Sequence, residues 1–151
     1  MHDKILISGC LLGQKVRYDG KGKAIQSDLL KQWQQEQRLI SVCPEVIGGL
    51  PVPRAPAERQ GQKVMTNDGD DVTQAFVSGA EQALALCKQH HIRFALLKES
   101  SPSCGSNTIY DGTFSDRKIN GQGICSQLLQ QHGIQVFSEL TINQLVELLD
   151  K

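Results

Sequence analysis

Residues 94–105 read FALLKESSPSCG, and this stretch joins an apolar run to a loop that carries a cysteine. The four apolar residues 94–97 are typical of a buried strand. A charged pair and three serines then lead past Pro102 to Cys104 and Gly105. Proline fixes the direction of a loop, and glycine lets its backbone pass close to a bulky group. The stretch therefore predicts a strand that ends in a rigid loop of small residues holding a thiol.

The rest of the chain alternates between short apolar runs and amphipathic segments. Further strands are predicted at residues 5–8 (ILIS), 39–43 (LISVC) and 136–137 (VF). Helices are predicted at residues 27–36, 72–90 and 124–131 and from Thr141 onward, with Ser27 and Thr141 suited to begin helices and Gly133 to end one. Strands that alternate with helices indicate an α/β domain with a mainly parallel sheet of about four strands.

Residues 44–71 do not fit this alternation, because they are rich in proline and glycine and show little periodicity. We expect a long, ordered loop here. Compact domains seldom contain such a loop unless it has a function. The segment is therefore expected to contribute to a functional site.

The composition limits the class of protein. The chain has 151 residues, which fits one domain over residues 1–151, and 39% of them are hydrophobic, as is ordinary for a globular protein. Lys and Arg together number 16, as do Asp and Glu, so the net charge is zero. A nucleic-acid-binding domain usually has a basic excess. We therefore expect a small-molecule partner and a monomer.

The compartment is inferred from the apolar runs and the cysteines. No segment reaches the roughly 18 consecutive apolar residues of a membrane helix, and the N-terminal apolar run is too short for a signal peptide. A cytoplasmic protein is expected. In that reducing compartment the five cysteines, an odd number, are not expected to form disulfides. A cysteine in a loop is then better explained by metal binding or catalysis.

Three of the cysteines follow predicted strands. Cys10 lies two residues after the first strand, Cys43 closes the second and Cys104 lies seven residues after the third. Ligands of open parallel sheets bind outside the carboxyl ends of the strands, so these three thiols are expected at one edge of the sheet. Cys87 falls on the apolar face of a predicted helix and is expected to be a small buried hydrophobe. Cys125 opens another helix, where the N-terminus could lower its pKa, although a core position is the preferred interpretation.

Three thiolates at one edge suggest a metal centre that lacks one protein ligand. A closed zinc site needs four ligands and usually has paired C-x-x-C spacings, which this chain lacks. Three cysteines on a [4Fe–4S] cluster would leave one iron open to a substrate. Spacing alone favours the iron–sulfur interpretation over zinc, and three unrelated thiols stay an alternative.

Polar residues beside these cysteines are candidates for proton transfer. Glu45 lies two residues after Cys43 and could act as a general base or bind substrate, or it could be a solvated loop acid. Ser101 lies three residues before Cys104 and could instead satisfy turn backbone. The segments VRYDG (residues 16–20) and IYDG (residues 109–112) are read first as turns.

Five motifs together resemble the 2-thiouracil desulfurase family of bacteria. They are SGCLLGQKVRYDG (8–20), VCPEVIGGLPVPRAPAE (42–58), GDDVTQAFVSGA (69–80), LLKESSPSCG (96–105) and IYDGTF (109–114). The resemblance runs in order over nearly the whole chain, and Gly9 stands where many members have alanine.

The resemblance implies a single-domain, Rossmann-like, three-layer fold and a [4Fe–4S] cluster held by Cys10, Cys43 and Cys104. It implies that the sulfur of a thiolated pyrimidine such as 2-thiouracil binds the open iron, and that water then replaces sulfur, which leaves as sulfide. A soft sulfur ligand suits thiophilic iron, which acts as a Lewis acid. The comparison also implies that Glu45 and Ser101 are catalytic, with Glu45 in proton transfer or water activation and Ser101 in positioning.

Other functions would also use such a cluster. A desulfurase of thiolated tRNA nucleosides would perform the same chemistry on a polymer, but it would normally carry an excess of Lys and Arg. A non-catalytic iron–sulfur module that senses oxygen or iron, or that binds sulfide, would hold a cluster without turnover. A zinc hydrolase with three thiolate ligands is a more distant alternative.

Overall fold

The computed structural model describes residues 3–13 and 28–149. Four parallel strands form the central sheet in the order β2-β1-β5-β8, with β1 at Ile5–Ser8, β2 at Leu39–Val42, β5 at Phe94–Leu97 and β8 at Gln135–Ser138. Every residue of β1 and β5 is buried, as expected for the two central strands of a sheet that is covered on both faces. The predicted mainly parallel sheet is confirmed.

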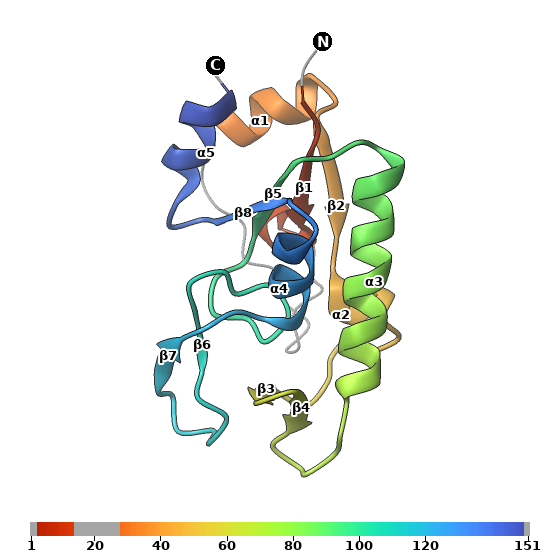
Figure 1. The fold of residues 1–151 in the computed structure, drawn as a ribbon, viewed down its shortest axis with the longest axis vertical. Helices are drawn as coiled ribbons and strands as arrows, with labels where there is room; N and C mark the ends of the chain where they lie inside the picture. Colours follow the sequence, from red (N-terminus) through yellow and green to blue (C-terminus); the bar gives the residue numbers. More distant parts are fainter. Residues whose placement is uncertain (1–2, 14–27, 150–151) are drawn as a thin grey trace.

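Helices cover both faces of the sheet (Figure 1). Alternate residues of β1 divide between two cores, since Leu6 joins one cluster of buried side chains and Ile5 and Ile7 join the other. The first core is completed by α3 (Thr73–Gln89) and α4 (Ile124–Gln131), and the second by α1 (Asp28–Gln35) and α5 (Ile142–Leu149). The expected three-layer α/β architecture is thus present.

The predicted elements agree with the observed ones to within a residue or two. Strands β1 and β5 and helix α4 have the predicted bounds, and Gly133 follows α4 with a φ of 83°. Helix α5 begins one residue after Thr141, whose hydroxyl accepts a hydrogen bond from the Ser138 N–H at 2.9 Å. The proposed cap Ser27 lies outside the described residues, as does the whole VRYDG segment.

The prediction of an irregular loop over residues 44–71 was wrong in part. Residues Pro44–Ile47 form the short helix α2, and β3 (Ala57–Gln60) pairs with β4 (Lys63–Thr66) as an antiparallel hairpin. A second hairpin of β6 (Thr108–Tyr110) and β7 (Lys118–Asn120) was not predicted. These strands are only three or four residues long and mostly polar, so they have little of the apolar alternation that identifies a strand.

The two hairpins lie beyond the carboxyl ends of the parallel strands (Figure 1). Glu58 of β3 accepts hydrogen bonds from the N–H groups of Gly112 and Phe114, and Gln60 donates to the Gly112 carbonyl at 2.7 Å. These contacts tie the β3–β4 hairpin to the loop between β6 and β7. The hairpins therefore form a wall opposite the edge of the sheet where the site residues lie.

No helix in residues 3–13 and 28–149 is long and apolar enough to cross a membrane.

Candidate functional site

Cys10, Cys43 and Cys104 lie at the carboxyl ends of three neighbouring strands. Cys10 is in the 3-10 helix Gly9–Leu12 directly after β1, Cys43 precedes α2 directly after β2, and Cys104 is in the loop after β5. All three line one cavity of about 420 Å³. The structure thus brings together the three thiols that the strand pattern placed at one edge.

Burial determines the state of these thiols. Burial raises the pKa of Cys104 well above its ordinary value, and the nearby thiols of Cys125, Cys43 and Cys10 raise it further. Burial also raises the pKa of Cys43, and the Glu45 carboxylate adds to the effect. A cationic group in the cavity would therefore be needed to keep several of these thiols ionised together.

Hydrogen bonds fix Cys104 from three sides. Its Sγ accepts from the Ser8 hydroxyl at 3.5 Å, and its N–H donates to Ser101 Oγ at 3.1 Å. Its carbonyl accepts from the buried hydroxyl of Ser126 on α4 at 2.7 Å. The position of this thiol is thus set by β1, by α4 and by its own loop.

Glu45 and Ser101 meet in the same cavity. Ser101 Oγ lies 3.5 Å from Glu45 Oε2 and accepts the N–H groups of Ser103 and Cys104, both at 3.1 Å. Since the backbone supplies both of those protons, the hydroxyl proton of Ser101 is left to point at Glu45. The contact joins helix α2 to the loop after β5, two segments that are far apart in the sequence.

Arg54 completes this arrangement from the segment that precedes β3. Its Nε donates to Glu45 Oε1 at 3.2 Å, and the Arg54 side chain is only 6% exposed. Burial raises the pKa of Glu45 above its ordinary value, whereas the Arg54 cation and the hydrogen bonds from Arg54 and Ser101 lower it. Burial has the larger effect, so Glu45 holds a proton more readily than an exposed glutamate would.

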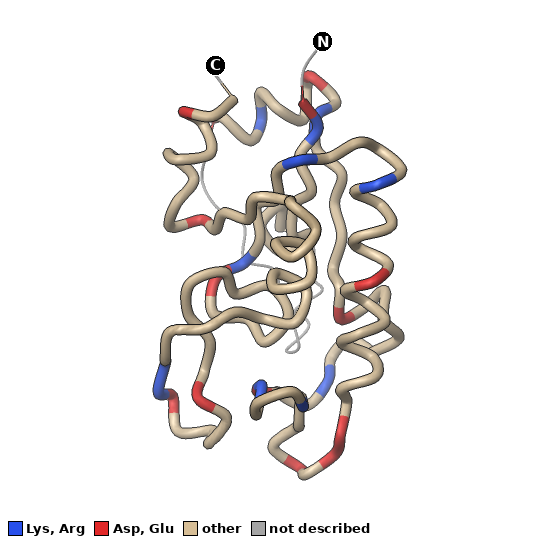
Figure 2. Tube along the Cα trace, in the orientation of Figure 1, with Lys and Arg blue, Asp and Glu red and all other residues tan. Residues whose placement is uncertain are grey.

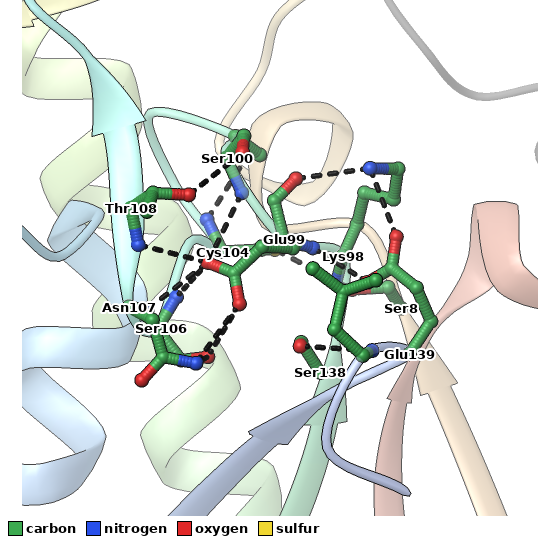
Figure 3. A network of polar contacts seen from close by, with 12 residues as sticks. Ser8, Lys98, Glu99, Ser100, Cys104, Ser106, Asn107, Thr108, Ser138 and Glu139 are labelled. Carbon is green, nitrogen blue, oxygen red and sulfur yellow. Dashed lines mark hydrogen bonds and ion pairs between the residues drawn. The ribbon is translucent and has the colours of Figure 1, made fainter. Parts of the chain in front are cut away.

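Glu99 also lines the cavity, and it is a residue of the site that sequence reasoning missed. Its buried carboxylate accepts hydrogen bonds from the N–H groups of Ser106, Asn107 and Thr108 and from the Ser106 and Asn107 side chains (Figure 3). Burial alone would raise the pKa of Glu99, but these hydrogen bonds and one with Ser138 outweigh it and lower the pKa to about 2. The sequence feature that could have revealed Glu99 is its place directly before a run of small polar residues, whose N–H and hydroxyl groups a carboxylate can bind.

Glycines allow the backbones of α3 and of the start of α4 to pack closely against the segments that carry Cys43 and Cys104. A Cβ on Gly79 of α3 would lie 1.8 Å from the Pro44 carbonyl oxygen, and a Cβ on Gly48 would lie 2.0 Å from the Ala75 oxygen. A Cβ on Gly123, before α4, would lie 2.4 Å from the Ser103 carbonyl. Helices α3 and α4 therefore support the residues next to Cys43 and Cys104 by direct backbone contact.

The other two cysteines belong to the core, as preferred from the sequence. Cys87 of α3 and Cys125 of α4 are fully buried in one hydrophobic cluster. Burial raises the pKa of Cys87 to about 11 and that of Cys125 to about 12. The pKa of Cys125 at the start of α4 is therefore raised and not lowered, because burial and the nearby thiols of Cys87 and Cys43 all act in that direction.

The second Tyr-Asp-Gly segment has two different roles. Tyr110 lines the cavity, together with Phe114, Lys98 and Lys118. Asp111 accepts hydrogen bonds from the N–H and hydroxyl of Thr113, and Gly112 has a φ of 92°. Asp111 and Gly112 therefore form a turn, as expected, and that turn places Tyr110 and Phe114 on the cavity wall.

Comparisons with known proteins agree over most of the chain. A sequence profile described as 2-thiouracil desulfurase matches residues 5–141. The Bacillus subtilis (strain 168) protein named uncharacterized protein YbbK is 40% identical over 152 residues, which cover 94% of this chain and 99% of that protein. The solved structure of the [4Fe-4S]-dependent thiouracil desulfidase TudS (DUF523Vcz) superimposes with a TM-score of 0.97, at 55% identity and with 98% of each chain covered. The profile spans all three cysteines of the cavity, and the chain therefore belongs to the 2-thiouracil desulfurase family.

Proposed function

We propose that this chain, as one domain over residues 1–151, is a [4Fe–4S]-dependent desulfidase. It converts 2-thiouracil, or a related thiolated pyrimidine, to the oxygen analogue and releases sulfide. The observation that carries the proposal is that three thiols from three adjacent strands share one cavity with the Glu45–Ser101 pair. Family membership and the likeness to the thiouracil desulfidase TudS support the same activity.

The residues present fit an iron–sulfur cluster. Cys10, Cys43 and Cys104 would hold it, since thiolates are the ligands such clusters use and a cationic centre would offset the raised pKa of the Cys43 and Cys104 thiols. No fourth cysteine in residues 3–13 and 28–149 lines the cavity, which fits a cluster with one iron open to a substrate. When bound, the cluster supplies a thiophilic Lewis acid that polarises a carbon–sulfur bond.

Glu45 and Ser101 supply the proton transfers. The reaction replaces C=S by C=O, consumes one water and releases hydrogen sulfide without a change in oxidation state. Glu45 accepts a proton from the attacking water, for which its raised pKa makes it a suitable base. Ser101 orients the reacting groups and passes a proton between Glu45 and the departing sulfur across the 3.5 Å contact.

A small substrate is favoured over a thiolated tRNA. Lys and Arg are interspersed with Asp and Glu along the described trace (Figure 2), and the net charge of the chain is zero. Phosphate-binding surfaces usually concentrate basic residues on one face. We propose a monomeric, cytoplasmic enzyme acting on a free thiobase, and a tRNA substrate is one outcome that the test below can reveal.

The test is an anaerobic purification followed by measurement of iron, acid-labile sulfide, and the uracil and sulfide formed from 2-thiouracil. The wild type is expected to hold about four irons per chain and to turn over, as expected for one such cluster. Cys104→Ala should lose both. Glu45→Gln should keep the iron and lose about 10²–10⁴-fold in kcat, the usual contribution of a general base. Glu81→Gln, on the exposed side of α3, is the matched control and should be fully active.

Each other outcome points to a specific alternative. A cluster without turnover on 2-thiouracil would favour a sensor, or a thiolated tRNA if salt-dependent tRNA binding accompanies it. Zinc in place of iron after anaerobic reconstitution would overturn the proposal. Full activity of Glu45→Gln would remove the assigned role of that carboxylate.

A further inference from the structure

We infer that Ser8 is a positioning residue that donates a hydrogen bond to the ligand sulfur of Cys104 and thereby tunes the cluster. The inference rests on the proposed function, because it assigns Cys104 to the cluster. Ser8 is the last residue of β1, is 3% exposed and places its Oγ 3.5 Å from Cys104 Sγ. It joins two strand ends, since Cys104 follows β5.

The direction of this hydrogen bond follows from the other contact of Ser8. The N–H of Lys98, one residue after β5, donates to Ser8 Oγ at 3.0 Å. A hydroxyl has one proton and can accept as well as donate. The Ser8 hydroxyl oxygen accepts the hydrogen bond from the Lys98 N–H. Its own proton is therefore available to donate to Cys104 Sγ.

Neighbouring polar contacts hold the Lys98 backbone in place (Figure 3). The Lys98 ammonium pairs with Glu139 Oε2 at 2.9 Å and donates to the Glu99 carbonyl at 2.9 Å. The other oxygen of Glu139 accepts the Glu99 N–H at 2.8 Å. The backbone of residues 98–99 is thus clamped, and β1 and β5 pair directly as far as Ile7 and Leu96. The donor to the sulfur therefore stands on a rigid part of the sheet.

A hydrogen bond to a ligand sulfur withdraws electron density from the iron–sulfur bond. Such bonds are among the main determinants of the reduction potential of a cluster, because they stabilise its more negative, reduced state. The same withdrawal makes the open iron a stronger Lewis acid for a substrate sulfur. Ser8 would thus act through Cys104 and touch no reacting atom.

The experiment compares Ser8→Ala, Ser8→Thr and Ser126→Ala with the wild type, all purified anaerobically with their clusters. Ser126 is the matched control, because it is also a buried serine bonded to Cys104, but through the carbonyl and not the sulfur. Reduction potentials are measured by spectroelectrochemistry, and iron per chain is measured before and after a fixed exposure to a chelator. Ser8→Ala is expected to have a more negative potential and to lose iron faster, whereas Ser8→Thr and Ser126→Ala keep the wild-type potential.

Equal potentials in Ser8→Ala and Ser126→Ala would overturn the inference, even if the wild type turns over 2-thiouracil as proposed. A wild type with no cluster would overturn the proposed function and this inference together. If Ser8→Ala does not fold, the hydrogen bond to sulfur is tested in the wild type, by comparing its resonance Raman spectra in H2O and in D2O. Iron–sulfur stretching bands that do not shift in D2O would show that no exchangeable proton is bonded to a ligand sulfur.

Discussion

At the scale of single residues, Glu99 determines the shape of the loop that carries Ser101 and Cys104. One buried carboxylate binds the N–H groups of three consecutive residues, 106–108, so the backbone after Cys104 must turn around it. A neutral amide of the same size can accept fewer hydrogen bonds and adds a donor among groups that already donate. The charge of Glu99, and not only its shape, is therefore required.

Glu99→Gln is expected to destabilise the protein at neutral pH. A pKa lowered from 4.5 to about 2 corresponds to about 3 kcal/mol of favourable interaction with the ionised carboxylate. We expect a loss of about that size in the free energy of unfolding at pH 7, measured by denaturant titration. Glu147→Gln, at an exposed position of α5, serves as control and should change little.

The same carboxylate predicts how stability depends on pH. Because the pKa of Glu99 is lower in the folded protein, its contribution is fully present above pH 4.5 and is lost as the pH falls toward 2. The difference in unfolding free energy between wild type and Glu99→Gln should therefore shrink steadily below pH 4.5. A difference that is constant between pH 7 and pH 3 would contradict this prediction.

At the scale of elements, the contact between α2 and α3 holds Cys43 and Glu45 in place. Alanine normally stabilises a helix relative to glycine by about 0.5–1 kcal/mol. Gly79→Ala should do the reverse, because the new Cβ would lie 1.8 Å from the Pro44 carbonyl oxygen and push α2 away from α3.

Overpacking of this kind typically costs about 1–3 kcal/mol, and a displaced α2 should also lower cluster occupancy. Unfolding free energy and iron per chain measure the two effects. Gln74→Ala, at an exposed position of the same helix, is the control and should change neither. If Gly79→Ala instead had a higher free energy of unfolding and the wild-type iron content, the two helices could move apart without affecting the site.

The sequence predicted the elements of the sheet layers well and the elements around the site less well. Strands such as β1 and β5 are buried on both faces, so an apolar run identifies them directly. The hairpins β3–β4 and β6–β7 are stabilised by long-range polar contacts, such as Glu58 with Gly112, which no local pattern reveals. For the same reason the strand pattern brought the three cysteines to one edge but gave no indication that Glu99 and Ser8 contact the loop of Cys104.

At the scale of the whole molecule, the site joins segments that are far apart in the chain. Cys10, Cys43 and Cys104 follow three different strands, and the Glu45–Ser101 contact spans 56 residues. A cluster bound by the three thiols would cross-link these segments in the folded state and not in the unfolded one. Ligands that bind only the folded state stabilise it by mass action.

Removal of the cluster is therefore expected to lower the Tm markedly. Anaerobic thermal unfolding of the protein before and after iron chelation measures the difference. Cys87→Ala, which removes a core thiol away from the cavity, should retain the chelator-sensitive fall in Tm, although its own Tm is lower. An unchanged Tm after complete loss of iron would show that the three segments need no cross-link.

The contacts of Glu58 and Gln60 with the loop between β6 and β7 also have an evolutionary consequence. Both hairpins lie in the crossovers between parallel strands, and their strands take no part in the central sheet, so changes in their length and sequence can leave that sheet intact. Since each hairpin supplies hydrogen bonds to the other, however, they must diverge as a pair. Because Glu58, Tyr110 and Lys118 of these hairpins line the cavity, we expect a chimera that takes residues 57–66 and 108–120 together from a relative to acquire that relative's substrate preference, whereas exchange of either hairpin alone should not.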